Sequence, residues 1–287
     1  MRPSRSQHPQ EDSQSAHFQR FSRMSRFLHA LLILSFLGLS ASGLPLRFPS
    51  ATWSRTLVNA FGGVHSAGVF HRLFAALLFT VFAAHLVDLH HTSRRYGGWR
   101  AMLTGHNSML PNTTDLRHFM ASLRWFLWRG KRPRYERYTY WEKFDYLAVF
   151  WGVVVIGSTG LVLCFPQIFA RILSGEWINV ARIVHSDEAL LAVLFIFIVH
   201  FFNTHLRPDR FPMDTSIFTG YISVKELRRE RAAEYERLQN STLGDLKLKL
   251  PCSRLRIFLF RSYACFALAA GLLLLALVVH ELLVAVQ

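Results

Sequence analysis

Apolar and polar stretches alternate along the chain in a pattern typical of multi-pass membrane proteins. A helix that crosses a bilayer needs about 20 mostly apolar residues, because the hydrocarbon core is about 30 Å thick. Five stretches reach that length: residues 27–46, 69–92, 144–165, 180–206 and 256–284. The pattern therefore predicts an all-α integral membrane protein with five transmembrane helices.

Positive charge is concentrated in alternate connections between these stretches. Basic residues outnumber acidic ones by five to two in residues 1–26, eleven to three in 93–143 and ten to seven in 207–255. The connections 47–68 and 166–179 hold only two and one basic residues. Since cytoplasmic loops of membrane proteins are enriched in Lys and Arg, we expect the N-terminus inside and the C-terminus outside.

This topology predicts four parts. Residues 1–26 form a cytoplasmic tail, and 27–206 form a four-helix transmembrane bundle with a cytoplasmic insert at 93–143. A second cytoplasmic segment, 207–255, leads into a fifth transmembrane helix within 256–287. The basic flank and small residues of the first apolar stretch also resemble a signal peptide, which is the alternative for that span.

Three segments outside the spans have helical character. The tail is polar and expected to be disordered, apart from a short interfacial helix near HFQRFSRMSRF. Within the first cytoplasmic insert, DLRHFMASLRWFLWRG predicts an amphipathic helix on the membrane surface. In the second cytoplasmic segment, VKELRRERAAEYERLQN predicts a charged helix.

Composition narrows the class of protein further. The chain has a net charge of +15 and is 51% hydrophobic. A soluble nucleic-acid-binding protein can share that charge, but its chain would not contain five membrane-length apolar stretches. The cysteines Cys164, Cys252 and Cys265 form neither a CxxC nor a CxxCH motif. Neither a zinc ribbon nor a covalently attached c-type haem is therefore supported.

Four histidines lie inside the second and fourth spans, where ionisable side chains are costly and usually functional. His71 and His85 are 14 residues apart, and His185 and His200 are 15 apart. On an α-helix these spacings correspond to about 21 and 22 Å along the axis and to roughly 40° and 60° around it. Each span therefore presents two histidines on a similar face, near its two ends.

The opposite directions of the two spans place these histidines in pairs at matching depths. His71 and His185 lie towards the outside, and His85 and His200 lie towards the cytoplasm. At each level, two neutral imidazoles can bind one haem iron from opposite sides. Hydrogen bonding between helices is the alternative role, and a single zinc ion cannot be shared across such a distance. The pattern favours two stacked b-type haems.

The spacings H-x13-H and H-x14-H on antiparallel spans resemble the di-haem cytochrome b of bc-type quinol oxidoreductases. The layout of spans is also similar to the membrane cytochrome b subunits of formate dehydrogenase and nickel–iron hydrogenase. The stretches YTYWEKFDYLAVFWGVVVIGSTGLVLCFP and HSDEALLAVLFIFIVHFFNTHLRPDRFPMD resemble bacterial cytochrome b subunits that work beside periplasmic multihaem cytochromes c. The resemblance covers about residues 25–255. It implies a multi-pass protein of the bacterial inner membrane.

The two families imply different ligands for the inner haem. The formate dehydrogenase type takes this ligand from the first span, where RFLHALLILSFLGLSASGLP supplies His29. The bc type takes it from the second span, which here supplies His85. Because His85 lies deeper and complements His71, we expect His85 to pair with His200. The other histidine would line a quinone pocket or hold a third haem together with His205.

Polar residues at either end of the fourth span are candidates for contact with a quinone such as menaquinone. The cytoplasmic edge offers His205, Arg207 and Asp209, which can bind a quinone carbonyl or relay protons. The outer edge offers Asp187 and Glu188 as the alternative. We expect the quinone at the cytoplasmic edge.

These features predict a subunit that passes electrons across the bilayer between the quinone pool and a periplasmic partner. That partner would be a multihaem cytochrome c or a dehydrogenase subunit, and it would carry the substrate specificity. The expected contacts are thus lipid, quinone and partner subunits, with no nucleic acid. The alternatives are a transporter that relays protons through histidines and a haem-free membrane anchor.

Overall fold

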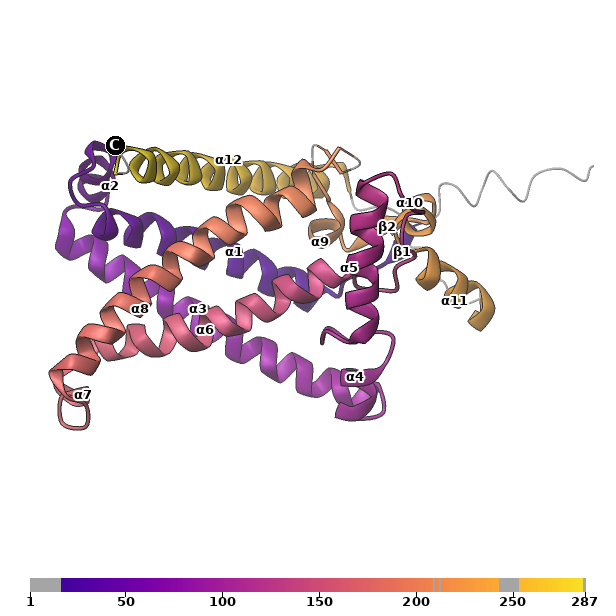
Figure 1. The fold of residues 1–287 in the computed structure, drawn as a ribbon, viewed down its shortest axis with the longest axis horizontal. Coiled ribbons are helices and arrows are strands. Elements are labelled where there is room, and N and C mark those ends of the chain that lie inside the picture. The colour runs from indigo at the N-terminus through magenta and orange to yellow at the C-terminus, as the bar shows by residue number, and fades with distance from the viewer. Residues whose placement is uncertain (1–16, 209, 212, 243–252, 286–287) are drawn as a thin grey trace, which may run out of the picture. The chain divides into compact units, whose positions relative to one another are not determined.

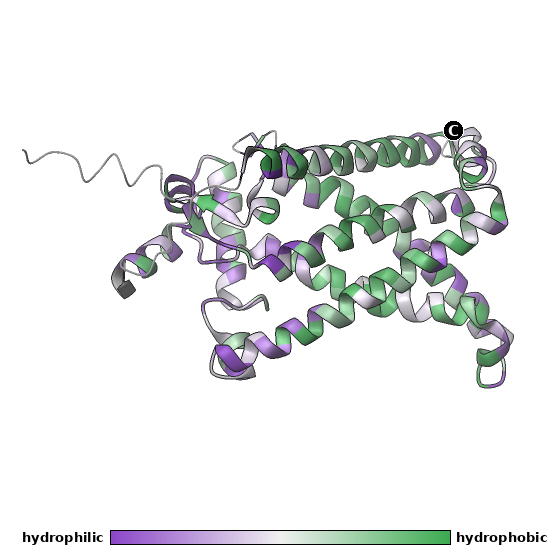
Figure 2. Cartoon of the chain, turned by 180° about the vertical axis from the view of Figure 1, so that it is seen from behind, coloured by the Kyte–Doolittle hydropathy of each residue, from purple (hydrophilic) through white to green (hydrophobic). Residues whose placement is uncertain are grey.

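The structure, a computed structural model, describes residues 17–208, 210–211, 213–242 and 253–285. Five helices in it are long and apolar enough to cross a bilayer (Figure 1). They are α1 (Arg23–Arg47), α3 (Val64–Arg95), α6 (Tyr140–Cys164), α8 (Gly175–Leu194) with its continuation to Leu206, and α12 (Arg254–Val284). Figure 2 shows hydrophobic residues along all five. The expectation of a helical chain with five membrane-length helices is confirmed.

Turn residues account for the start of α3 and the end of α6. Gly62 and Gly63 precede α3 with φ values of +87° and +102°, a backbone region that side chains other than glycine rarely adopt. At the end of α6, Pro166 lacks the N–H that a continuing helix needs, and it starts the short helix α7 instead. These two helix boundaries could therefore be predicted from the sequence.

The shorter elements lie between the long helices. The helices among them are α2 (Thr52–Ala60), α4 (Trp99–Thr104), α5 (Thr113–Phe126), α7 (Pro166–Phe169), α9 (Ser216–Thr219), α10 (Val224–Glu230) and α11 (Ala232–Thr242). The strands β1 (His17–Gln19) and β2 (Tyr221–Ser223) form an antiparallel pair. Helix α2 had no counterpart among the sequence-based expectations.

Two local expectations need correction. The tail segment expected to be a helix contains β1, because its backbone pairs with β2, a strand about 200 residues away that no local pattern reveals. The charged run after β2 is two helices, α10 and α11, separated at Arg231, where φ is −132°. In contrast, α5 forms as expected, and Asn112 and Asp115 close its start with a capping box.

The chain divides into two compact units, which we describe separately. Unit 1 comprises residues 1–26, 92–144 and 215–260. Unit 2 comprises residues 27–91, 145–214 and 261–287. Most of each long helix lies in unit 2, whereas the polar connections belong mainly to unit 1.

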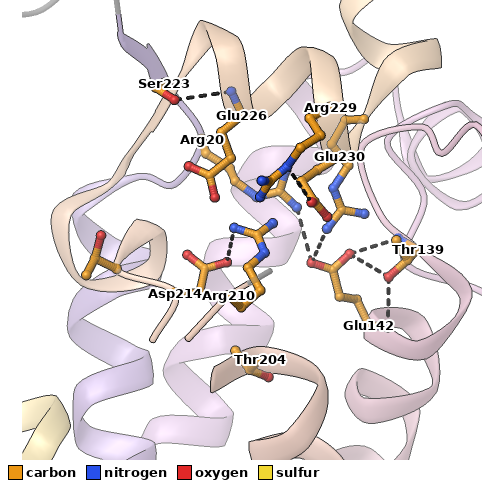
Figure 3. Close-up of polar contacts among 12 residues, drawn as sticks. Arg20, Thr139, Glu142, Thr204, Arg210, Asp214, Ser223, Glu226, Arg229 and Glu230 are labelled. Atoms are coloured by element: carbon orange, nitrogen blue, oxygen red, sulfur yellow. Dashed lines mark hydrogen bonds and ion pairs between the residues drawn. The ribbon is translucent and has the colours of Figure 1, made fainter. Parts of the chain in front are cut away.

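Buried ion pairs join the separate segments of unit 1 (Figure 3). The carboxylate of Glu142 accepts hydrogen bonds from Arg20 at 3.3 Å, from Arg231 at 2.7 Å and from the backbone and hydroxyl of Thr139. The side chains of Arg20 and Arg231 are both 4% exposed. Buried charges are stable only when they are paired and hydrogen-bonded. The three segments of unit 1 are thus held together by charge as well as by the β1–β2 pair.

In unit 2, contacts between side chains link the long helices to their neighbours. The apolar core contains Leu44 of α1, Val193 of α8 and Leu274 of α12, together with Phe197, Phe201 and Val278. Helix α12 is held further by a hydrogen bond from Tyr263 to the carbonyl of Ala30 and by one from Trp53 to Glu281. The fifth helix is therefore an integral part of unit 2.

Helix α8 does not remain α-helical to its end. It continues as two π-helical segments, η1 (Phe195–His200) and η2 (Phe202–Leu206). A π-helix has i→i+5 hydrogen bonds, so residues five apart lie on nearly the same face, whereas on an α-helix they are about 140° apart. The rings of His200 and His205 accordingly lie with their centres 6.4 Å apart. The wider turn gathers two histidines that a regular α-helix would separate.

Candidate functional site

His71 of α3 and His185 of α8 face each other in unit 2. Their ring centres are 6.3 Å apart, with the ring planes at 74°. Two imidazole nitrogens that bind one metal ion from opposite sides, each at about 2.0 Å, place the ring centres roughly 6 Å apart. The pair therefore has the separation that a shared metal ion in the centre of a haem requires.

The Nδ1 atom of each of these rings is engaged in a hydrogen bond. His71 Nδ1 lies 3.0 Å from Ser42 Oγ, whose own proton is donated to the carbonyl of Gly38 at 2.6 Å. His185 Nδ1 donates to the carbonyl of Ile156 at 2.9 Å. Metal-binding histidines almost always donate the proton of their other ring nitrogen in this way. Both Nε2 atoms would then keep a lone pair that could bind a metal ion.

Two glycines make room for these rings. A Cβ added at Gly43 in α1 would lie 2.9 Å from His71 Cε1, and one at Gly160 in α6 would lie 3.0 Å from His185 Cε1. Real Cβ contacts are almost never as short as the distance at Gly43, and the distance at Gly160 is tighter than nine in ten of them. The groups that approach these two glycines are therefore the histidine rings themselves.

At the other end of α8, His200 interacts with a carboxylate. Its Nδ1 atom lies 3.0 Å from Oδ2 of Asp145 in α6, and the side chain of Asp145 is only 14% exposed. His29 of α1 lies within electrostatic range of both His200 and His205. This end of unit 2 therefore holds three histidines from two helices, with one of them oriented by an acid.

His85 occupies a different environment. Its Nε2 atom is 2.9 Å from the hydroxyl of Tyr146, and its ring also packs on Phe150 at 6.0 Å. Tyr146 follows Asp145 in α6, so His85 and His200 lie at a similar level, as the spacing predicts. The ring nitrogen that would bind an iron is, however, occupied by the tyrosine.

The three candidates for quinone contact at the cytoplasmic edge are placed unequally. His205 is buried, and its Nδ1 atom has no hydrogen-bond partner among the described residues. Arg207 is the residue that follows η2, and its backbone N–H donates a hydrogen bond to the carbonyl of Phe202. Asp209 lies outside the described residues. In the same part of unit 2, the buried Arg210 pairs with Asp214 at 3.1 Å (Figure 3).

At the opposite edge, both acidic candidates have partners. Asp187 forms an ion pair with Arg47 at 2.8 Å, and both side chains are exposed. Glu188 accepts a hydrogen bond from the indole N–H of Trp151 at 3.4 Å. These contacts link α8 to α1 and α6 close to His185.

Sequence reasoning missed Asp145 and Tyr146, which are the hydrogen-bond partners of His200 and His85. Both lie in the stretch KFDYLAVF at the start of the third span. A carboxylate at the edge of an apolar stretch is the signal that could have identified Asp145, because such a group needs a partner. The partner itself could not be read from the sequence.

No protein-family model matches the chain, and no curated protein matches it. Among the described residues, no group of three or more His, Cys, Asp or Glu side chains forms a cage for a metal ion. His71 and His185 occur instead as two facing rings, an arrangement that could hold a metal within a cofactor such as haem.

Proposed function

We propose that the chain is the membrane cytochrome b subunit of a quinone-linked oxidoreductase complex in a bacterial inner membrane. It would bind two b-type haems and pass electrons between the quinone pool and a periplasmic redox partner. One observation carries this proposal: the rings of His71 and His185 face each other, and the Nδ1 atom of each forms a hydrogen bond with a group other than the facing ring. The haems would supply one-electron redox chemistry.

For the second haem, we propose His29 rather than His85 as the partner of His200. The Nε2 atom of His85 is taken by Tyr146, whereas His29 lies within electrostatic range of His200. The Nδ1 atom of His200 is oriented by Asp145, which leaves its Nε2 atom for the iron. The ligand proposed here is thus the first-span histidine of the formate dehydrogenase type, whereas the spacing had favoured the second-span histidine His85.

His205 is the best-supported contact for the quinone. A buried nitrogen without a partner is costly, and a ligand that hydrogen-bonds to it removes that cost. The π-helical turn places this ring beside His200, so a quinone that bonds to His205 would be close to the second haem. With the orientation expected from the positive-inside rule, this end would face the cytoplasm, and quinone chemistry would exchange protons with that side.

The absorbance spectrum of the purified chain tests the proposal. We expect a reduced-minus-oxidised spectrum of a bis-histidine b haem and two haems per chain by extraction. A menaquinol analogue should reduce them, and His205→Ala should slow this reduction without lowering haem content. If the chain contains no haem after purification from haem-replete cells, the proposal is wrong.

A substitution that displaces the ring of a proposed haem ligand, without removing that ligand, should also lower the affinity of the chain for haem. In Gly160→Ala the new Cβ would crowd His185, although alanine favours the helix by about 1 kcal/mol over glycine. Disturbing the surroundings of a metal ligand typically lowers affinity by about 10–100-fold. Gly152→Ala is the matched control in the same helix, since its nearest contact would be an ordinary 3.8 Å to Ile156. Equal haem affinity in the two variants would contradict the role of Gly160.

A further inference from the structure

The histidines at the two ends of unit 2 differ in the charge of the group that is hydrogen-bonded to their Nδ1 atoms. His71 is held by a hydroxyl and His185 by a backbone carbonyl, and both of these acceptors are neutral. His200 is held by the carboxylate of Asp145 at 3.0 Å. The two haem positions are therefore not equivalent electrically.

The carboxylate of Asp145 is directed at His200. It is 14% exposed, and its second oxygen, Oδ1, is buried without a hydrogen-bond partner in the described part of the chain. Burial weakens solvent screening, so the negative charge acts more strongly on its neighbours than it would at a wet surface. The group that receives its hydrogen bond, His200, feels this charge most directly.

We propose that Asp145 makes the haem bound by His200 the low-potential haem of the two, an inference that rests on the function proposed above. A carboxylate that accepts the Nδ1 proton makes the imidazole a stronger electron donor to the metal. Its negative charge also favours the ferric state, which carries one positive charge more than the ferrous state. Hydrogen bonding around the ligand is one of the levers by which proteins set haem potentials.

This asymmetry would decide where an electron rests between the two sites: the haem of His71 and His185 would hold it in preference to the haem of His200. A quinol at His205 would give up two electrons, one at a time, together with two protons, and would leave as a quinone. Each electron would pass first to the haem of His200 and then downhill to the haem of His71 and His185, and a redox protein would accept it from there.

A spectroscopic redox titration of the haem-loaded chain tests the inference. The wild type should titrate in two steps. In Asp145→Asn, which keeps the size and an acceptor oxygen but removes the charge, the lower step should move upward while the upper step stays in place. A tenfold change in the ratio of reduced to oxidised haem corresponds to about 59 mV for one electron, and we expect a shift of at least that size. Glu176→Gln, which removes an exposed carboxylate from the first turn of α8, should move neither step.

A second measurement decides the matter if Asp145→Asn binds haem poorly. His71→Ala should retain only the haem of His200, and its midpoint potential should match the lower wild-type step. A match to the upper step, or an Asp145→Asn titration identical to the wild type, would overturn the inference and leave the proposed function standing. Absence of haem from the wild type would remove the proposed function instead.

Discussion

Replacing His71 by alanine should reduce the haem content of the purified chain from two haems to one. The iron at this level would keep only His185, because His71 is the ring that faces it at 6.3 Å. A bis-histidine b haem is held without covalent bonds, so the loss of one axial ligand removes much of its binding energy. Haem extraction and the reduced-minus-oxidised spectrum measure the result directly.

The matched control for this variant is His65→Ala. His65 lies in the same helix, α3, but is exposed. It should therefore keep both haems. A His71→Ala chain that still binds two haems with unchanged spectra would show that the facing pair is an interhelical contact rather than a metal site.

A comparison of His29→Ala with His85→Ala should identify the partner of His200. We expect His29→Ala to lose the second haem, because this ring lies within electrostatic range of His200. His85→Ala should keep both haems, since the Nε2 atom of His85 is already bonded to Tyr146 at 2.9 Å. Haem content and the spectrum of the haem that remains distinguish the two variants.

Tyr146→Phe completes this experiment. It releases His85 Nε2 without changing the ligands that we propose, so both haems should remain. If instead His85→Ala loses a haem and His29→Ala does not, the ligand set of the bc type applies and the inner haem spans α3 and α8. Retention of both haems in both single variants would point to His205 as the second ligand.

Hydropathy and charge were sufficient to predict the five long helices. Each span needs an apolar stretch of a minimum length, and this condition is visible in any one stretch by itself. The spacing of His71, His85, His185 and His200 likewise predicted two levels, since the rise of a helix is fixed. The β1–β2 pair and helix α2 were not predicted, because both depend on contacts or turns with weak local signals.

The sequence by itself determined the class of the protein, the number of its long helices and the two levels of histidine. Only the tertiary structure decided which groups these histidines contact. The wide π turn brings His205 beside His200. The hydroxyl of Tyr146 is hydrogen-bonded to Nε2 of His85, and the carboxylate of Asp145 is hydrogen-bonded to Nδ1 of His200. The physical reason is that helical repeat fixes the height of a side chain, whereas its hydrogen-bond partner depends on which neighbouring helix packs against it and in what register.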